Sequence, residues 1–149
     1  MPGSYTQLLY HFVFSTKERR PLIDASLKEP LYDYIGGIVR GMKHCDLLEI
    51  GGVADHVHML VRLHPSIAVA DALRVYKTNS SKWANEQRQK GWFEWQEGYA
   101  AFTVSQSQVA VLRAYILNQE PHHRRRGFRS ELITLLKKHG IKFEERYLD

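Results

Sequence analysis

DHVHMLVRL, at residues 55–63, is the stretch of sequence from which the fold can be worked out. Hydrophobic residues recur at every second position from Val57 to Leu63, which is the period of a β-strand. One face of this strand carries Val57, Met59, Val61 and Leu63, and the other carries His56, His58, Leu60 and Arg62. We expect the first face to contact the core and the second to present two imidazoles side by side.

Two further strands are expected before this one. Residues 5–16 are apolar on both faces of the alternation, which indicates a central strand covered on both sides. Residues 44–53 read as another strand, and a short connection at 54–55 leads from it into the histidine-containing strand. Between the two, apolar residues at helical spacing predict a helix over 24–42 that glycines weaken near its end.

The remaining sequence predicts a helix over 66–90, a short strand over 98–104, a helix over 105–120 and a last helix over 130–139. Ser105 and Gln108 have the spacing of a capping box, Pro121 limits the helix that follows them, and Gly140 ends the last helix. The order β-α-β-β-α-β predicts an α+β fold of the ferredoxin-like or RRM-like split βαβ type. We expect an antiparallel sheet with helices on one side, plus a C-terminal helix that carries Tyr115.

Length and composition indicate one domain over residues 1–149, with 44% hydrophobic residues to form a core. No apolar run approaches roughly 18 residues, which a membrane-spanning helix needs, so no membrane association is expected. Cys45 is the one cysteine, which excludes an internal disulfide and favours a reducing, cytoplasmic setting.

The net charge of +5 is concentrated near the C-terminus. Residues 113–146 contain nine Lys/Arg and four Asp/Glu, whereas the rest of the chain has twelve of each. Such a region suits a polyanion such as nucleic acid, although a solvated basic surface explains it as well.

His56 and His58 are candidate metal ligands because residues two apart on a strand point the same way. Two imidazoles can hold a divalent cation but leave its coordination open, so a third ligand must come from elsewhere. Taken alone, the pattern also fits two surface or half-buried histidines.

Tyr115 and Gln119 form the second candidate pair, four residues apart on one helix face. Leu112 and Ile116 place them at the edge of the apolar stripe. A tyrosine hydroxyl can be the nucleophile in phosphoryl transfer, and an amide oxygen is a hard metal ligand. The same pattern also fits an amphipathic helix with a half-buried tyrosine.

Together these features resemble the single-tyrosine HUH transposases of the smallest bacterial and archaeal insertion sequences. The resemblance covers nearly the whole chain and has no departure at the motif positions. It rests on HFVFSTK at 11–17, DHVHMLV at 55–61, Lys77 with Ser80 and Ser81, WQEGY at 95–99, FTVS at 102–105, YILNQ at 115–119, and His122 with His123.

The resemblance implies a role for each of these site residues. His56 and His58 would be metal ligands, Gln119 the third ligand and Tyr115 the nucleophile, with Mg²⁺ or Mn²⁺ as the metal. It also implies a homodimer whose active sites are shared, with the histidines from one subunit and the tyrosine helix from the other. The substrate would be single-stranded DNA with hairpins at the element's ends, and the setting the cytoplasm of a bacterium or archaeon.

Several polar residues are expected to contact the DNA backbone. In the first part of the chain they are Lys17, Arg74, Lys77, Ser81 and Arg88; past the tyrosine helix they are His122, His123, Arg124, Arg125 and Arg126. A solvated helix face explains the four on the long helix about as well.

Two rival functions remain. A non-catalytic RRM-like module would bind nucleic acid through aromatic residues on its central strands, but here a central strand presents histidines instead. A related HUH nuclease, either a replication initiator or a protein domesticated for host repeats, would keep the same chemistry. Replication initiators tend to pair the tyrosine with a lysine, so Gln119 favours the transposase.

Overall fold

The structure is a computed structural model that describes residues 3–88, 90–123 and 127–148. Its sheet has four antiparallel strands in the order β2-β3-β1-β4. The strands are β1 (Leu9–Ser15), β2 (Asp46–Val53), β3 (His56–Arg62) and β4 (Ala100–Val104). The helices are α1 (Ala25–Gly41), α2 (Val69–Gln87), α3 (Val109–Leu117), α4 (Gln119–His123) and α5 (Phe128–Lys138), with short 3-10 turns η1 (Lys17–Arg19), η2 (Gln106–Gln108) and η3 (Glu145–Tyr147). The expected α+β fold is confirmed.

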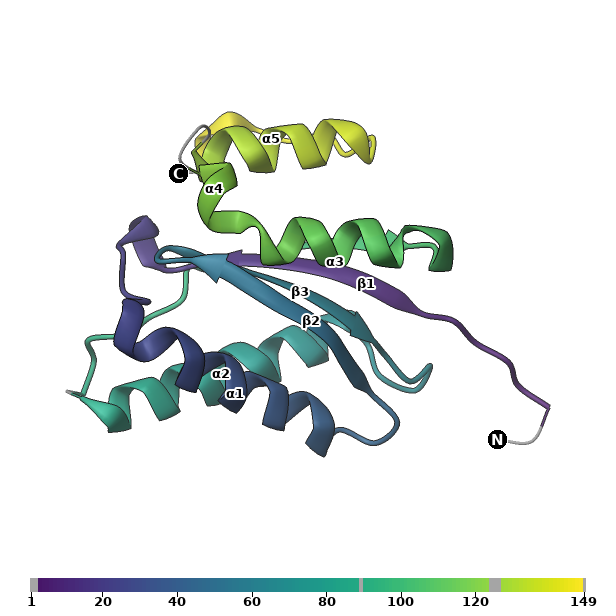
Figure 1. Ribbon diagram of the computed structural model, residues 1–149, viewed down its shortest axis with the longest axis horizontal. Helices are drawn as coiled ribbons and strands as arrows, with labels where there is room; N and C mark the ends of the chain where they lie inside the picture. Colours follow the sequence, from purple (N-terminus) through teal and green to yellow (C-terminus); the bar gives the residue numbers. More distant parts are fainter. Residues whose placement is uncertain (1–2, 89, 124–126, 149) are drawn as a thin grey trace.

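Helices cover both faces of the sheet. In Figure 1, α1 and α2 lie below the sheet, α3 lies directly above it, and α5 lies above α3. The two-helix face encloses the larger core, which includes Phe12, Val57, Met59 and Tyr76. A second cluster joins Val13, Phe102, Phe128 and Leu136, so it holds α5 against the opposite face.

Strand β3 is the most enclosed part of the sheet. Every residue from His56 to Val61 is fully buried, on both faces of the alternation. The predicted alternation is therefore correct, but its histidine face is covered by the C-terminal helices rather than open. An RRM-like module needs an exposed central strand for stacking bases, and this strand is not exposed.

The predicted helix over 105–120 is wrong in one respect that matters for the site. The segment divides into η2, α3 and α4, and Asn118 at the break has φ −102° and ψ 30°. Ser105 makes no capping bond through its side chain and instead contacts the hydroxyl of Ser107 at 3.0 Å. Pro121 lies inside α4, so the chain bends before the proline rather than at it.

The other boundaries differ by a few residues. The first strand begins at Leu9 and not at residue 5, the long helix spans Val69–Gln87, and the last helix begins two residues early, at Phe128. Gly140 follows the last helix with φ +68°, a backbone conformation that favours glycine, as predicted. Among the described residues, no helix is both long enough and apolar enough to cross a membrane.

Helix α3 lies on strand β2 without an intervening side chain. A Cβ atom on Gly51 would collide with the backbone oxygen of Ile116, so the helix and strand backbones approach closely here. Ile116 is the one fully buried side chain of α3, whereas Val111 and Leu117 are 67% and 66% exposed. Glycine at position 51 therefore sets the height of the tyrosine helix above the sheet.

Candidate metal and tyrosine site

The two histidines of the motif project from the centre of the sheet toward α3 and α5. In the β1–β3 register, His58 lies opposite Val13, and His11 lies opposite Leu60. Because paired residues of an antiparallel sheet point the same way, His11 joins His56 and His58 on one face. Three imidazoles are thereby gathered on the two central strands.

The outer nitrogen of each motif histidine has a defined partner. His56 Nδ1 lies 2.7 Å from Asp55 Oδ1, and a carboxylate can only accept, so Nδ1 donates. His58 Nδ1 lies 2.7 Å from Nε2 of His11. Such contacts fix the orientation of each ring and turn its Nε2 atom inward.

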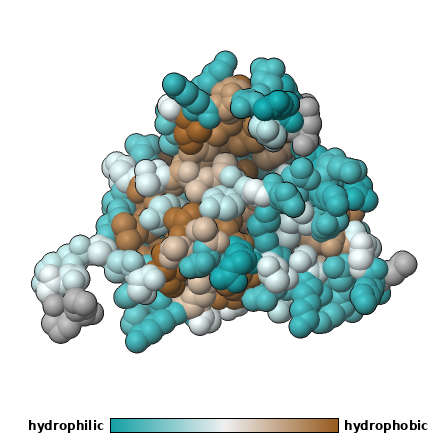
Figure 2. Space-filling view, turned by 180° about the vertical axis from the view of Figure 1, so that it is seen from behind, coloured by the Kyte–Doolittle hydropathy of each residue, from teal (hydrophilic) through white to brown (hydrophobic). Residues whose placement is uncertain are grey.

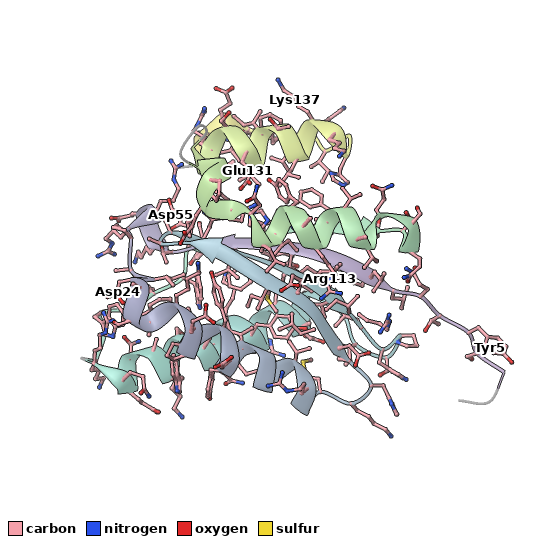
Figure 3. All side chains as sticks on the ribbon, viewed as in Figure 1. Tyr5, Asp24, Asp55, Arg113, Glu131 and Lys137 are labelled. Atoms are coloured by element: carbon pink, nitrogen blue, oxygen red, sulfur yellow. The ribbon has the colours of Figure 1, made fainter. Side chains whose placement is uncertain are left out.

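Both inner nitrogens converge on Glu131, which reaches the site from α5. Oε1 of this carboxylate lies 3.1 Å from His58 Nε2 and 3.4 Å from His56 Nε2. The side chain is 2% exposed, and Figure 3 shows it in the region between α5 and the tyrosine helix. The sequence pattern around Glu131 did not predict a role for this residue.

The tyrosine pair completes the cluster. Tyr115 donates its hydroxyl hydrogen to Glu131 Oε2. Gln119 is 1% exposed, its Oε1 lies 3.2 Å from His56 Nε2, and its Nε2 donates to the backbone oxygen of Tyr115. One chain thus brings Tyr115, Gln119 and the two motif histidines together, although their roles remain predictions.

Burial and hydrogen bonding oppose each other in setting the charges of the cluster. Burial alone would lower the pKa of His56, but hydrogen bonds to Asp55 and Glu131 offset it and raise the pKa to about 8. Burial alone would raise the pKa of Glu131, but hydrogen bonds from His56 and His58 hold it far below its usual range. Burial and the neighbouring His58 lower the pKa of His11 to about 3, so His11 is neutral near pH 7.

The geometry fits a divalent cation. One ligand atom each from His56, His58 and Glu131 lies within 4.8 Å of the other two, and all three residues are buried. Gln119 adds an amide oxygen beside His56. Imidazole nitrogens with carboxylate and amide oxygens form a donor set that suits Mn²⁺ well and Mg²⁺ acceptably.

A cavity of about 450 Å³ opens beside this cluster, between β4, α3 and α5. Glu131, His11 and Tyr115 line its inner end, and Phe102 and Leu135 belong to its apolar walls. Figure 2, seen from behind, shows hydrophobic surface in the middle of the molecule, framed by hydrophilic residues. A nucleotide base has flat faces that stack on apolar and aromatic side chains, and this cavity has the size for one.

The structure does not bring the four expected DNA contacts on the long helix to the site. Arg74, Lys77, Ser81 and Arg88 belong to α2 and its C-terminal end, on the opposite face of the sheet from the histidine cluster. Lys17 forms an ion pair with Glu94, and Arg74 one with Asp71. DNA contact by these residues stays a prediction.

Three of these residues have a structural explanation. Lys77 donates to the backbone oxygens of Gln96 and Gly98, both at 2.7 Å, and so fastens α2 to the segment before β4. Arg88 donates to Asp24 at the start of α1. The hydroxyl of Ser81 donates to the oxygen of Thr78 within its own helix.

The expected DNA contacts past the tyrosine helix have no described side-chain positions. The side chains of His122 and His123, and all of Arg124, Arg125 and Arg126, lie outside what the structure describes. Their contact with the DNA backbone also stays a prediction.

Sequence reasoning missed Glu131, His11 and Asp55 as members of the site. Asp55 and His11 both lie in segments quoted for the family resemblance, and strand register would have placed His11, opposite Leu60, on the same face as His58. Glu131 had a weaker signal: it is an acidic residue between Phe128 and Leu135, on the apolar stripe of its helix.

A four-stranded antiparallel sheet, with a His-x-His pair on a central strand facing a tyrosine helix, defines a protein of the HUH class. The family model described as "Transposase IS200 like" matches residues 4–119. The chain therefore belongs to the IS200-like transposase family, as the resemblance implied.

Individual relatives agree with this assignment. The chain is 30% identical to the transposase for insertion sequence element IS200 of Salmonella typhimurium, over 74% of this chain and 75% of the relative. It is 25% identical to the ISDra2 transposase TnpA of Deinococcus radiodurans, over 78% of this chain and 87% of the relative.

Two solved structures have the same fold. A crystal structure assigned as a transposase from Deinococcus radiodurans superposes with a TM-score of 0.64 and 25% identity, covering 80% of this chain and 95% of its own. A REP-associated tyrosine transposase bound to a REP hairpin superposes with a TM-score of 0.58 and 13% identity, covering 78% of this chain and 68% of its own.

Proposed function

We propose that this chain is an enzyme that cleaves and rejoins single-stranded DNA at the ends of an insertion sequence, with Tyr115 as its nucleophile. One observation carries the proposal: the Tyr115 hydroxyl and the Nε2 atoms of both motif histidines meet at a single buried carboxylate. A nucleophile held beside a pair of metal ligands is the constellation that attack on a phosphate diester requires.

The cation we propose is Mg²⁺ or Mn²⁺, held by His56, His58 and Gln119. Their inward-facing nitrogen and oxygen atoms, with the rings oriented by Asp55 and His11, support this role. Bound there, the ion would stabilise negative charge on a non-bridging phosphate oxygen.

In the covalent step, the Tyr115 oxygen forms a bond to phosphorus and the bond from phosphorus to the 3′ oxygen breaks. The tyrosine hydroxyl loses one proton and the departing 3′ oxygen gains one, so the step is balanced. Its products are a 5′-phosphotyrosine and a free 3′-hydroxyl. The number of phosphate ester bonds is unchanged, and rejoining by the reverse step needs no nucleotide cofactor.

The proposed substrate is single-stranded DNA next to a hairpin at an element end. The apolar cavity beside Tyr115 can take an unpaired base, which a fully paired duplex does not offer. The basic surplus of residues 113–146 supplies attraction to phosphates, so binding should weaken steeply as salt is raised.

The assembly we propose is a homodimer, on the strength of the family resemblance. Within such a dimer, each histidine pair can work with Tyr115 of its own chain or with Tyr115 of the other chain. The contacts within one chain support a site that uses its own Tyr115; a shared site requires α3 to leave Gly51 and Glu131 and to dock on the partner.

The test is incubation of the protein and Mn²⁺ or Mg²⁺ with single-stranded oligonucleotides from the flanks of its own gene, followed by denaturing electrophoresis. A covalent protein–DNA band that disappears in chelator supports the proposal. Hairpins from host repeats serve as the second substrate set, and adducts with those alone would indicate a domesticated nicking enzyme. Equal cleavage of a matched duplex without a hairpin would contradict the proposed substrate.

A further inference from the structure

Helix α5 contributes Glu131 to the site, although the helix lies beyond residue 119, where the family match ends. The helix is otherwise held by apolar contacts: Phe128 and Leu136 pack with Val13 and Phe102 of the sheet. Glu131 interrupts this apolar surface with a carboxylate that is 2% exposed. A buried carboxylate is costly unless it is paired, so its position needs a specific explanation.

We propose that Glu131 is a protein ligand of the divalent cation and, at the same time, the group that positions Tyr115. The inference rests on the proposed function for the identity of the reaction, but the ligand set itself rests on geometry. Oε1 faces Nε2 of both motif histidines, at 3.1 and 3.4 Å, and Oε2 accepts the tyrosine hydroxyl. One carboxylate thereby connects the metal ligands to the nucleophile.

The chemistry of the donor set favours this assignment. Two neutral imidazoles and one amide oxygen leave both positive charges of a Mg²⁺ or Mn²⁺ ion uncompensated in a buried site. A carboxylate oxygen is the preferred ligand of both ions and cancels one of these charges. Glu131 offers that oxygen, and the atoms it would share the ion with already lie within 4.8 Å of one another.

A purely structural alternative is an ion pair between Glu131 and a protonated His56. That role would make Glu131 important for the stability of the fold but would leave cation affinity unaffected or raise it, since the histidines would be released. Measuring cation affinity therefore separates the two roles, and catalytic activity is not needed to do so.

The experiment is titration of the full chain with Mn²⁺ alone, without DNA, followed by electron paramagnetic resonance and calorimetry. Glu131→Gln keeps the size of the side chain and removes its charge, and we expect at least a roughly tenfold weaker Kd. Glu131→Asp keeps the charge but withdraws it by one methylene, and should give an intermediate Kd. Thermal unfolding followed by circular dichroism establishes that each variant is folded.

Two matched controls sharpen the result. Glu145→Gln removes an acidic group from the exposed turn η3 and should leave Mn²⁺ affinity unchanged. Tyr115→Phe removes the hydroxyl that Glu131 accepts but no proposed ligand, so affinity should change by less than about twofold. If Glu131→Gln is unfolded, Glu131→Asp and Glu131→Leu carry the same comparison.

Each outcome bears on one claim. Equal Mn²⁺ affinity in wild type and folded Glu131→Gln would overturn the ligand role while leaving tyrosine chemistry intact. A wild-type chain that binds no Mn²⁺ at millimolar concentration would also overturn it. Weakened binding in Glu131→Gln, with no adduct formed by wild type on any DNA, would sustain the ligand role and overturn the proposed function instead.

Discussion

His11 Nε2 lies 2.7 Å from His58 Nδ1, with the two rings stacked at 5.0 Å between centroids. Only one of the two nitrogens can carry the shared hydrogen. When His58 Nδ1 donates it, His58 Nε2 carries no hydrogen and can bind a metal, whereas in the metal-free site Nε2 donates to Glu131 Oε1. His11 is held neutral by burial and by its neighbour, so it can accept this hydrogen. When a metal replaces the hydrogen on His58 Nε2, His11 would therefore supply the acceptor for the hydrogen on Nδ1.

A first prediction tests whether His11 is the acceptor that His58 needs to bind a metal. His11→Phe keeps an aromatic ring against Phe102 but removes the acceptor, and Mn²⁺ affinity should fall about tenfold. His11→Gln, which retains an acceptor oxygen, should lose less. The measurement is Mn²⁺ titration by electron paramagnetic resonance; unchanged affinity in His11→Phe would show that His58 needs no partner to orient it.

The second prediction concerns the nucleophile. Tyr115→Phe removes one oxygen and keeps the ring that packs beside His58. The covalent adduct should disappear. Hairpin binding in a gel-shift assay and the melting temperature should stay near wild type, because α3 remains packed on β2. Tyr99→Phe, at an exposed position, is the matched control. An undiminished adduct in Tyr115→Phe would mean that another tyrosine attacks.

The third prediction concerns pH. The pKa of His56 is raised from 6.5 to about 8 in the metal-free site, so a proton competes with the metal up to pH 8. Mn²⁺ affinity should therefore rise between pH 6.5 and pH 8 and then level off. At pH 7, calorimetry in buffers of different ionisation enthalpy should detect release of about one proton. Asp55→Asn removes a hydrogen bond that raises this pKa, and should move the plateau to lower pH.

The fourth prediction tests which chain supplies the tyrosine. Tyr115→Phe chains are mixed with His56→Ala/His58→Ala chains under conditions that allow subunit exchange. If each site uses its own tyrosine, as the contacts within one chain support, the mixture stays inactive. If sites are shared, some mixed dimers join an intact histidine pair to an intact tyrosine, and adduct formation returns. Light scattering on the same samples measures the dimer itself.

A fifth prediction concerns the close packing of the tyrosine helix α3 on strand β2. Gly51→Ala places a methyl group against the backbone oxygen of Ile116, so α3 must shift. We expect destabilisation of about 1–3 kcal/mol and slower adduct formation. Gly37→Ala is the control, because its methyl group meets nothing within 4 Å and lies in α1. That variant should be neutral or more stable by roughly 0.5–1 kcal/mol.

Local patterns predicted the parts of the site that local structure determines. The alternation around His58 correctly placed two imidazoles on one face. The spacing of Tyr115 and Gln119 predicted that they would lie close together on one helix; they do lie close together, but on two helices, α3 and α4. The break at Asn118 was not predicted, because the sequence there continues a helical pattern. The change of direction between α3 and α4 depends on tertiary contacts that the local pattern does not contain.

Glu131 could not be predicted for a related reason. Its place in the site depends on the direction in which α5 returns over the sheet, and that direction follows from the contacts of Phe128 and Leu136 with distant strands. No pattern within residues 128–138 contains this information. The acidic residue on an apolar helix face is a signal only once the opposite surface is known to hold histidines.

The position of β1 and β3 at the centre of the sheet has a consequence for how the site comes apart. His11, His56 and His58 lie on strands hydrogen-bonded on both sides, whereas Tyr115 lies on a helix with one fully buried side chain. Local opening costs least where few apolar contacts are lost. During unfolding by heat or denaturant, we therefore expect the helix that carries Tyr115 to detach first, while the imidazoles keep their arrangement until the sheet itself unfolds.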